Sequence, residues 1–167
     1  ASVLVQVREI GSDLQFSTTG GTMDLTGMTL GGAYGNNFSG WGAGMDPSAT
    51  TGFWTGGSTG GSNNGNHWTG SISVNESNWN MDTSFNGADS VSVSGVFFGF
   101  GVNSPSFIST PADFTEGVNA VSASTILFLS RSLADINLSE GESITATFGD
   151  NSDTITVTVV PEASATA

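Results

Sequence analysis

Strict alternation of apolar and polar residues is the feature that most constrains the fold of this chain. In residues 154–160 the apolar Ile155, Val157 and Val159 alternate with three threonines. Successive side chains of a β-strand point to opposite faces, so the pattern predicts a strand with one buried face. Residues 143–148 alternate in the same way, and the polar residues 149–153 between the two segments predict a hairpin.

The N-terminal residues alternate as well. Val3, Val5 and Val7 share one face, and a Gly-Ser-Asp turn at residues 11–13 leads into a second apolar stretch at residues 14–16. This pattern predicts an N-terminal hairpin. A terminal strand can also pair with the open edge of a neighbouring molecule. Two interpretations therefore stay open: the three valines are buried within their own sheet, or they form an assembly strand that joins subunits into a polymer.

Short strand patterns recur along the chain, and helical signals are weak. Further strands are predicted at residues 22–25, 71–74, 90–98 and 124–130, while residues 133–138 predict a turn of helix or a loop. The seven to nine short strands, with long Gly- and Asn-rich loops, predict an all-β chain folded as an antiparallel β-sandwich of jelly-roll type. An open-ended barrel is the alternative. A single domain over residues 1–160 suits the length of 167 residues.

The middle of the chain has a different composition. Residues 31–80 are rich in Gly, Ser, Asn and Thr, which predicts an ordered loop region within the sandwich, and they contain all four tryptophans: Trp41, Trp54, Trp68 and Trp79. Flat aromatic faces stack on sugar rings, while Asn side chains and Gly backbone groups bind hydroxyls. The tryptophans are therefore candidates for carbohydrate binding. Burial in the core and contact between subunits are the alternatives.

The charge balance disfavours several partners. The formal net charge is −13, with fifteen acidic residues against two arginines and no lysine, so nucleic acids and anionic membranes would be repelled. Zero cysteine excludes disulfides, thiolate zinc sites and cysteine nucleophiles. No apolar run approaches the roughly 18 residues of a transmembrane helix. We expect no membrane contact in the form given, with any signal peptide already removed.

Catalytic patterns are poorly represented. His67 is the only histidine, and it lies in a segment, residues 63–68, that predicts a surface turn without a nucleophile elbow. Glu76, Asp82 and Asp89 could supply the paired carboxylates of a glycosidase. Solvated surface acids explain these three residues more simply. We expect a protein that is not an enzyme.

Calcium is the one ion that the sequence suggests. Asp150 and Asp153 flank an Asn-Ser pair, and such hard oxygen ligands suit a weak structural calcium site. The alternative is a plain turn in which Asp and Asn side chains bond to the neighbouring backbone. No other cofactor is expected.

Five segments carry a family resemblance through their order along the chain. They are residues 8–14 (REIGSDL), 20–28 (GGTMDLTGM), 111–123 (PADFTEGVNAVSA), 133–142 (LADINLSEGE) and 148–162, which runs from a Phe-Gly pair through Asp-Thr-Ile-Thr to Pro-Glu. In this order the segments resemble bacterial PEP-CTERM proteins, the exported substrates of exosortase-type sorting enzymes. Ala163 stands where that family has its second proline, and the apolar helix and arginine cluster of the sorting signal do not follow.

The resemblance implies a destination and no enzymatic activity. Residues 161–167 are expected to be the remnant of a C-terminal sorting segment. The implied destination is the cell surface or an extracellular matrix rich in exopolysaccharide. We therefore expect a secreted, non-enzymatic structural protein that associates with itself, with filaments as one form, and that meets extracellular polysaccharide. A carbohydrate-binding module that uses the loop tryptophans is the alternative.

Overall fold

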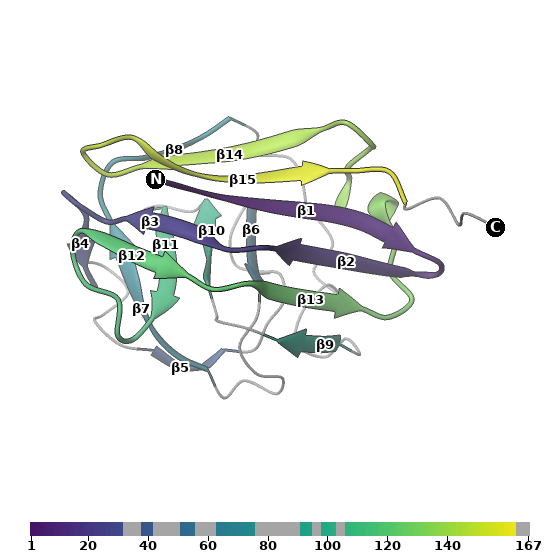
Figure 1. The fold of residues 1–167 in the computed structure, drawn as a ribbon, viewed down its shortest axis with the longest axis horizontal. Helices are drawn as coiled ribbons and strands as arrows, with labels where there is room; N and C mark the ends of the chain where they lie inside the picture. Colours follow the sequence, from purple (N-terminus) through teal and green to yellow (C-terminus); the bar gives the residue numbers. More distant parts are fainter. Residues whose placement is uncertain are drawn as a thin grey trace.

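The computed structural model describes residues 1–31, 38–41, 51–55, 63–75, 91–94, 98–102 and 106–162. For residues 38–41, 51–55, 63–64, 91–94 and 102 it describes the backbone alone. These residues form two mostly antiparallel β-sheets that stack as an open sandwich (Figure 1). The strands of the smaller sheet cross behind those of the larger one at a steep angle. The all-β sandwich expected from the alternating patterns is thus confirmed.

The larger sheet has nine strands. Its hydrogen-bonded order is β8-β14-β15-β1-β2-β13-β9, with β3 beside β1 and β12 beside β3. The bounds are β1 Ser2–Ile10, β2 Asp13–Thr18, β3 Gly21–Asp24, β8 Ile72–Val74, β9 Val91–Ser94, β12 Val118–Val121, β13 Ser124–Phe128, β14 Ser143–Phe148 and β15 Asp153–Val159. Both predicted hairpins, β1–β2 and β14–β15, are present.

The smaller sheet has six strands in the order β4-β7-β11-β10-β6, with β5 also paired to β7. Its strands are β4 Thr29–Leu30, β5 Phe38–Trp41, β6 Thr51–Thr55, β7 Asn63–Thr69, β10 Phe98–Val102 and β11 Phe107–Pro111. Four of them lie within residues 29–70, a span that largely coincides with the predicted loop region. The described residues form fifteen strands in all, so the expected count of seven to nine was too low.

Strand β1 lies in the middle of the larger sheet. It pairs with β15 in parallel, with Val5 opposite Val157, and with β2 in antiparallel, with Val7 opposite Phe16. The parallel pair departs from the purely antiparallel sandwich that was predicted. It places the first and last strands of the chain side by side, with the start of β1 next to the start of β15 (Figure 1).

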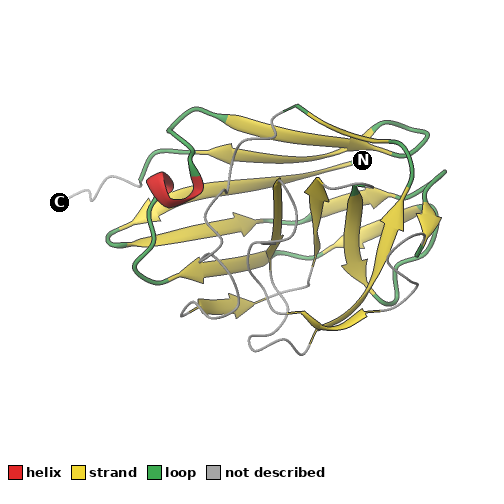
Figure 2. Ribbon diagram, turned by 180° about the vertical axis from the view of Figure 1, so that it is seen from behind, coloured by secondary structure: helices red, strands yellow, loops and turns green. Residues whose placement is uncertain are grey.

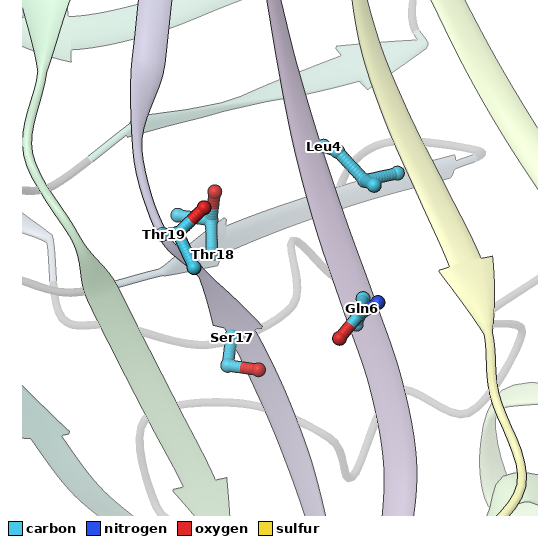
Figure 3. A pocket seen from close by; sticks show the side chains of 5 residues that line it. All are labelled: Leu4, Gln6, Ser17, Thr18 and Thr19. Atoms are coloured by element: carbon cyan, nitrogen blue, oxygen red, sulfur yellow. The ribbon is translucent and has the colours of Figure 1, made fainter.

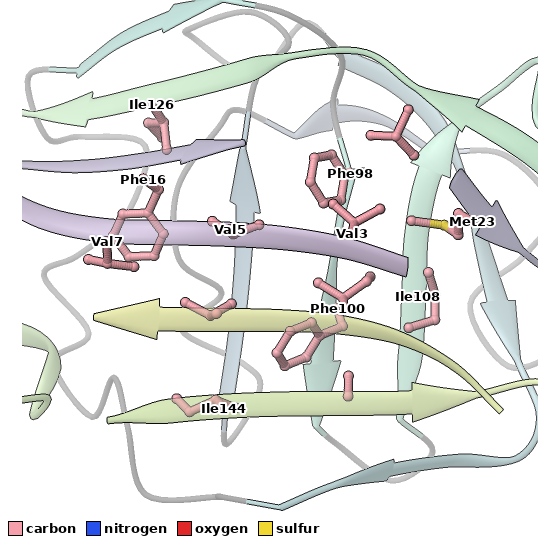
Figure 4. Packing of buried hydrophobic residues seen from close by; sticks show 14 of the residues in the cluster. Val3, Val5, Val7, Phe16, Met23, Phe98, Phe100, Ile108, Ile126 and Ile144 are labelled. Carbon is pink, nitrogen blue, oxygen red and sulfur yellow. The ribbon is translucent and has the colours of Figure 1, made fainter. Parts of the chain in front are cut away.

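The core lies between the two sheets. The larger sheet contributes the inward-facing residues of each alternating strand, and the smaller sheet contributes Trp68, Phe98, Phe100 and Ile108 (Figure 4). Phe16 and Phe128 meet edge to face, with ring centroids 5.9 Å apart. Burial of this apolar surface is the main driving force for such a fold. The alternation in the sequence therefore reports the inner face of the larger sheet.

One short helical turn completes the described chain. It is the 3₁₀ helix η2, Leu133–Ile136, which ends at Asn137 in the left-handed conformation and buries Ile136 (Figure 2). This settles the choice between a helical turn and a loop that the sequence left open. Among the described residues, no helix is long and apolar enough to cross a membrane.

Candidate functional site

The turns at one end of the sandwich are joined by a network of carboxylate hydrogen bonds. Asp153, buried at the start of β15, accepts hydrogen bonds from the backbone amides of Asp24 and Thr154. Asp24 in turn accepts bonds from the amide and hydroxyl of Thr26, at 3.0 and 2.6 Å, and from the Asn151 side chain at 2.7 Å. The end of β3 is thereby tied to the β14–β15 turn.

The same network controls the ionisation of Asp24. The Thr26 hydroxyl, then the Asn151 amide and the Thr26 backbone amide, all donate to the carboxylate and lower its pKa below the ordinary value of 3.8. Hydrogen bonds to the charged form favour that form. Asp24 is therefore held as an anion whose oxygens already have partners.

The calcium prediction named residues in this network. Asp150 is exposed, and its backbone amide donates to the Thr26 carbonyl at 2.9 Å. Besides its two amide donors, Asp153 has the N-terminal ammonium 3.9 Å away. Within the part of the chain that the structure describes, no group of three or more His, Cys, Asp or Glu side chains is placed to hold a metal ion. In this structure the Asp153 carboxylate accepts hydrogen bonds from backbone amides of β3 and β15.

His67 does not lie in a surface turn, and that prediction was wrong. It lies in β7 and is 2% exposed. Its Nδ1 is 3.1 Å from the hydroxyl of Ser109, which is directly opposite in β11, and its ring meets Phe107 edge to face at 4.9 Å. Because Ser109 is fully buried, a substrate has no access to this histidine–serine pair as it stands. Glu76, Asp82 and Asp89, the candidate carboxylates, lie outside the described residues.

The four tryptophans separate into three situations. Trp68 is 3% exposed, and its indole N–H donates to the Thr110 hydroxyl at 2.9 Å, so the ring belongs to the core. Trp41 and Trp54 lie in strands β5 and β6, of which only the backbone is described. Trp79 lies outside the described residues. For Trp68 the core alternative is thus confirmed, whereas carbohydrate binding by the other three tryptophans stays a prediction.

Val3, Val5 and Val7, the candidate assembly residues, point into the core of their own molecule. Both edges of β1 are paired within the chain, to β15 on one side and to β2 and β3 on the other. The pairing within the chain is thus present in the single molecule, and assembly through this strand stays a prediction. Any exchange of this strand between molecules has to break those pairings first.

Sequence patterns missed a hollow on the outer face of the larger sheet. It measures about 180 Å³ and is lined by Leu4, Gln6, Ser17, Thr18 and Thr19. Figure 3 shows Leu4 and Gln6 on β1, Ser17 and Thr18 at the end of β2, and Thr19 just beyond it. The local signal was the Thr-Gly-Gly sequence at residues 19–21, which interrupts the alternation of β2 and β3.

Comparison with known proteins identified no relative. No family model matches the chain, and neither a curated protein nor a solved structure matches it.

Proposed function

We propose that this chain is a non-enzymatic structural protein, exported to the cell surface or the extracellular matrix, where its copies associate with one another. One observation carries the proposal. The five segments that resemble PEP-CTERM proteins lie far apart in the sequence, yet they bond to one another in the fold. The resemblance therefore falls on residues that hold a scaffold together.

Two of these bonds involve the first segment, residues 8–14. The amide of Gly11, in the β1–β2 turn, donates to the Glu162 carboxylate at 2.8 Å. The Glu9 carboxylate accepts a bond of the same length from the amide of Leu133, which opens the 3₁₀ helix. The first segment is thus bonded to both the fourth and the fifth.

The second segment, residues 20–28, makes the remaining connections. Leu25 donates its amide to the carbonyl of Gly117 at 2.8 Å, which ties it to the third segment. Asp24 and Asp153 tie it to the fifth. Gly27 has a φ of +79°, and a β-carbon there would collide with the Asp150 carboxylate. A glycine that permits close approach of two turns has a packing role.

The surface composition is consistent with this proposal. Hydroxyl pairs bridge β14 and β15 on their outward faces, Ser143 with Thr158 at 2.9 Å and Thr145 with Thr156 at 3.1 Å. A net charge of −13 keeps copies apart outside specific contacts. Such a surface suits a protein that works at high local concentration. The jelly-roll connectivity expected from the sequence stays part of the proposal.

Self-association is proposed to proceed by exchange of the terminal strand. In this arrangement β1 leaves its place between β15 and β2 and fills the same place in a second copy, with the same register. Exchange of an identical element is a low-cost route to assembly, because every contact is re-formed in the neighbour. Light scattering over a wide concentration range tests it. Growth of large particles is expected, and a persistent monomer would overturn the assembly part of the proposal.

Location is tested separately. Immunogold electron microscopy of the source cells, with antibodies raised against this chain, should label the cell surface or the surrounding matrix. Fibres or sheets that carry the label would support both parts of the proposal. Label confined to the cell interior would contradict export, whatever the state of assembly.

A further inference from the structure

The hollow on the outer face of the larger sheet is created by the backbone. Gln6 of β1 is paired with Ser17 of β2, and Val3 of β1 is paired with Gly21 of β3. The two paired residues are thus three positions apart in β1 but four positions apart in the segment that faces it, which has one extra residue. One extra residue in one strand of a pair is a β-bulge, and it leaves residues unpaired and spreads the strands. Thr18, Thr19 and Gly20 have no partner in the register of β1.

Glycines hold this bulge in place. Gly20 and Gly21 have φ values of +101° and +155°, and a β-carbon on either would collide with a backbone carbonyl, that of Val121 or that of Ser2. The bulge also changes which residues point inward. In β2, before the bulge, the even-numbered Phe16 and Thr18 are buried, whereas in β3, after it, the odd-numbered Met23 is buried. A slip of one residue exchanges the two faces of a strand. The hollow is therefore a fixed part of the fold.

The groups that line the hollow are uncharged and rich in hydrogen-bonding capacity. Ser17, Thr18 and Thr19 bring three hydroxyls, each able to donate and to accept. The Thr18 oxygen accepts a bond from the Gly20 amide at 3.1 Å, which holds the buried Thr18 side chain against the bulge. The Arg8 guanidinium donates to the side-chain oxygen Oε1 of Gln6 at 2.9 Å, which fixes the side-chain amide so that its nitrogen can donate to a ligand.

An apolar surface completes the lining. Leu4 is 50% exposed and brings an apolar side chain to the hollow. The volume of about 180 Å³ is below the roughly 300 Å³ at which pockets for drug-sized ligands begin. A ligand that fits is small, carries several hydroxyls and has one apolar face. A single sugar ring has these properties.

We propose that this hollow binds one neutral sugar residue, either free or as a unit of a polysaccharide. The sugar hydroxyls bond to Gln6, Ser17 and Thr19, while the C–H face of the ring lies on Leu4. The five residues that line the hollow are all uncharged. The net charge of −13 further disfavours acidic saccharides. The proposal rests on residues other than the tryptophans and does not depend on the protein being structural.

The test uses the full chain labelled with ¹⁵N, together with a panel of neutral gluco-, manno- and galacto-oligosaccharides and polygalacturonate as the acidic arm. Chemical-shift changes are expected at the amides of residues 4–6 and 17–20 with at least one neutral sugar. Absence of binding across the neutral panel would overturn the proposal. So would shifts confined to other residues, or binding of the acidic polymer alone.

A matched pair of variants locates the site. Ser17→Tyr fills the hollow, whereas Thr125→Tyr adds the same side chain at the directly paired position of β13, outside the lining. Loss of affinity by about tenfold or more is expected for Ser17→Tyr, and a change of less than about twofold for Thr125→Tyr. Equal effects of the two variants would contradict the assignment.

A third variant keeps the proposal testable if Ser17→Tyr fails to fold. Gln6→Leu keeps the size of a half-exposed side chain and removes its amide. We expect this variant to bind the sugar at least about threefold more weakly, the lower range for loss of one hydrogen bond. Unchanged affinity in a folded Gln6→Leu protein would count against the site.

Discussion

The buried carboxylate of Asp153 accepts a hydrogen bond from the backbone amide of Asp24, a residue 129 positions earlier in the chain. This bond connects the end of β3 to the start of the last strand, close to the point where β15 begins to pair with β1. A single side chain thus joins β3 to β15, two strands that the sequence keeps far apart. The arrangement explains why the Asp-Thr-Ile-Thr segment begins with an acidic residue on an otherwise apolar inner face.

Removal of this carboxylate should destabilise the fold. Asp153→Ala leaves the Asp24 amide buried without its acceptor, which costs about 1–3 kcal/mol of unfolding free energy. Urea denaturation measures the loss. The control is Asp150→Ala in the same turn, where the side chain is exposed and a change within about 0.5 kcal/mol is expected. Equal effects of the two variants would show that the turn, and not this bond, matters.

Low pH should remove the stability that the ionised Asp24 carboxylate gives to the folded state. Because its pKa is lowered in the folded state, the stability contributed by its carboxylate is present above the ordinary value of 3.8 and is lost as pH falls through the lowered value. Asp24→Asn lacks this contribution at every pH. The difference in unfolding free energy between the wild type and Asp24→Asn should therefore be constant near neutral pH and shrink below pH 3.8. A gap that persists unchanged at pH 2 would assign the effect to lost packing or hydrogen bonds.

The bulge should tolerate only glycine. Gly20→Ala places a β-carbon against the Val121 carbonyl in addition to requiring a positive φ. Gly11, with a φ of +61°, has open space around it and serves as the matched control. Gly11→Ala should cost about 1–2 kcal/mol from the left-handed conformation alone, and Gly20→Ala clearly more. Thermal melting compares the two, and a milder effect at Gly20 would contradict the geometry of the bulge.

Deletion of residues 1–9 should unfold the protein. Burial of one valine side chain stabilises a fold by roughly 1.5–3 kcal/mol, so the three buried valines of β1 together contribute about 5–9 kcal/mol to the free energy of unfolding. That amount is comparable to the whole stability of a typical domain, about 5–15 kcal/mol. A synthetic peptide of residues 1–10, added in excess, should restore the circular dichroism of a β-protein by filling the vacant place. A truncated chain that folds without the peptide would show that β1 is dispensable to the fold.

The strands that could be predicted from the sequence are those with a local signal. β1, β14 and β15 each alternate cleanly, and the turns between hairpin partners are rich in Gly, Asn and Asp. The smaller sheet has little such signal. In β10 the sequence Phe-Gly-Phe-Gly-Val puts a glycine at every second position, and glycine is depleted in strands. These segments become strands because Phe98 and Phe100 gain a core to pack against, which is a property of the whole fold.

The burial of His67 and Trp68 could not be predicted from the local sequence, for a related reason. Their segment reads Asn-Asn-Gly-Asn-His-Trp-Thr, a composition typical of turns. Across the sheet, β11 supplies the Ser109 and Thr110 hydroxyls as partners for the histidine ring and the indole. Polar residues can be buried once such partners exist. Those partners are more than forty residues away in the chain.

The all-β class, the two hairpins and the inner face of the larger sheet can be read from short stretches of sequence, because alternation with period two is a local consequence of strand geometry. Three features become visible only in the folded chain: β15 pairs in parallel with β1, a Gly-rich segment forms much of a second sheet, and a one-residue bulge opens a hollow beside Leu4. Each of these depends on which distant segments meet. That choice is made by the burial and hydrogen bonding of the whole chain, which no short stretch of sequence records.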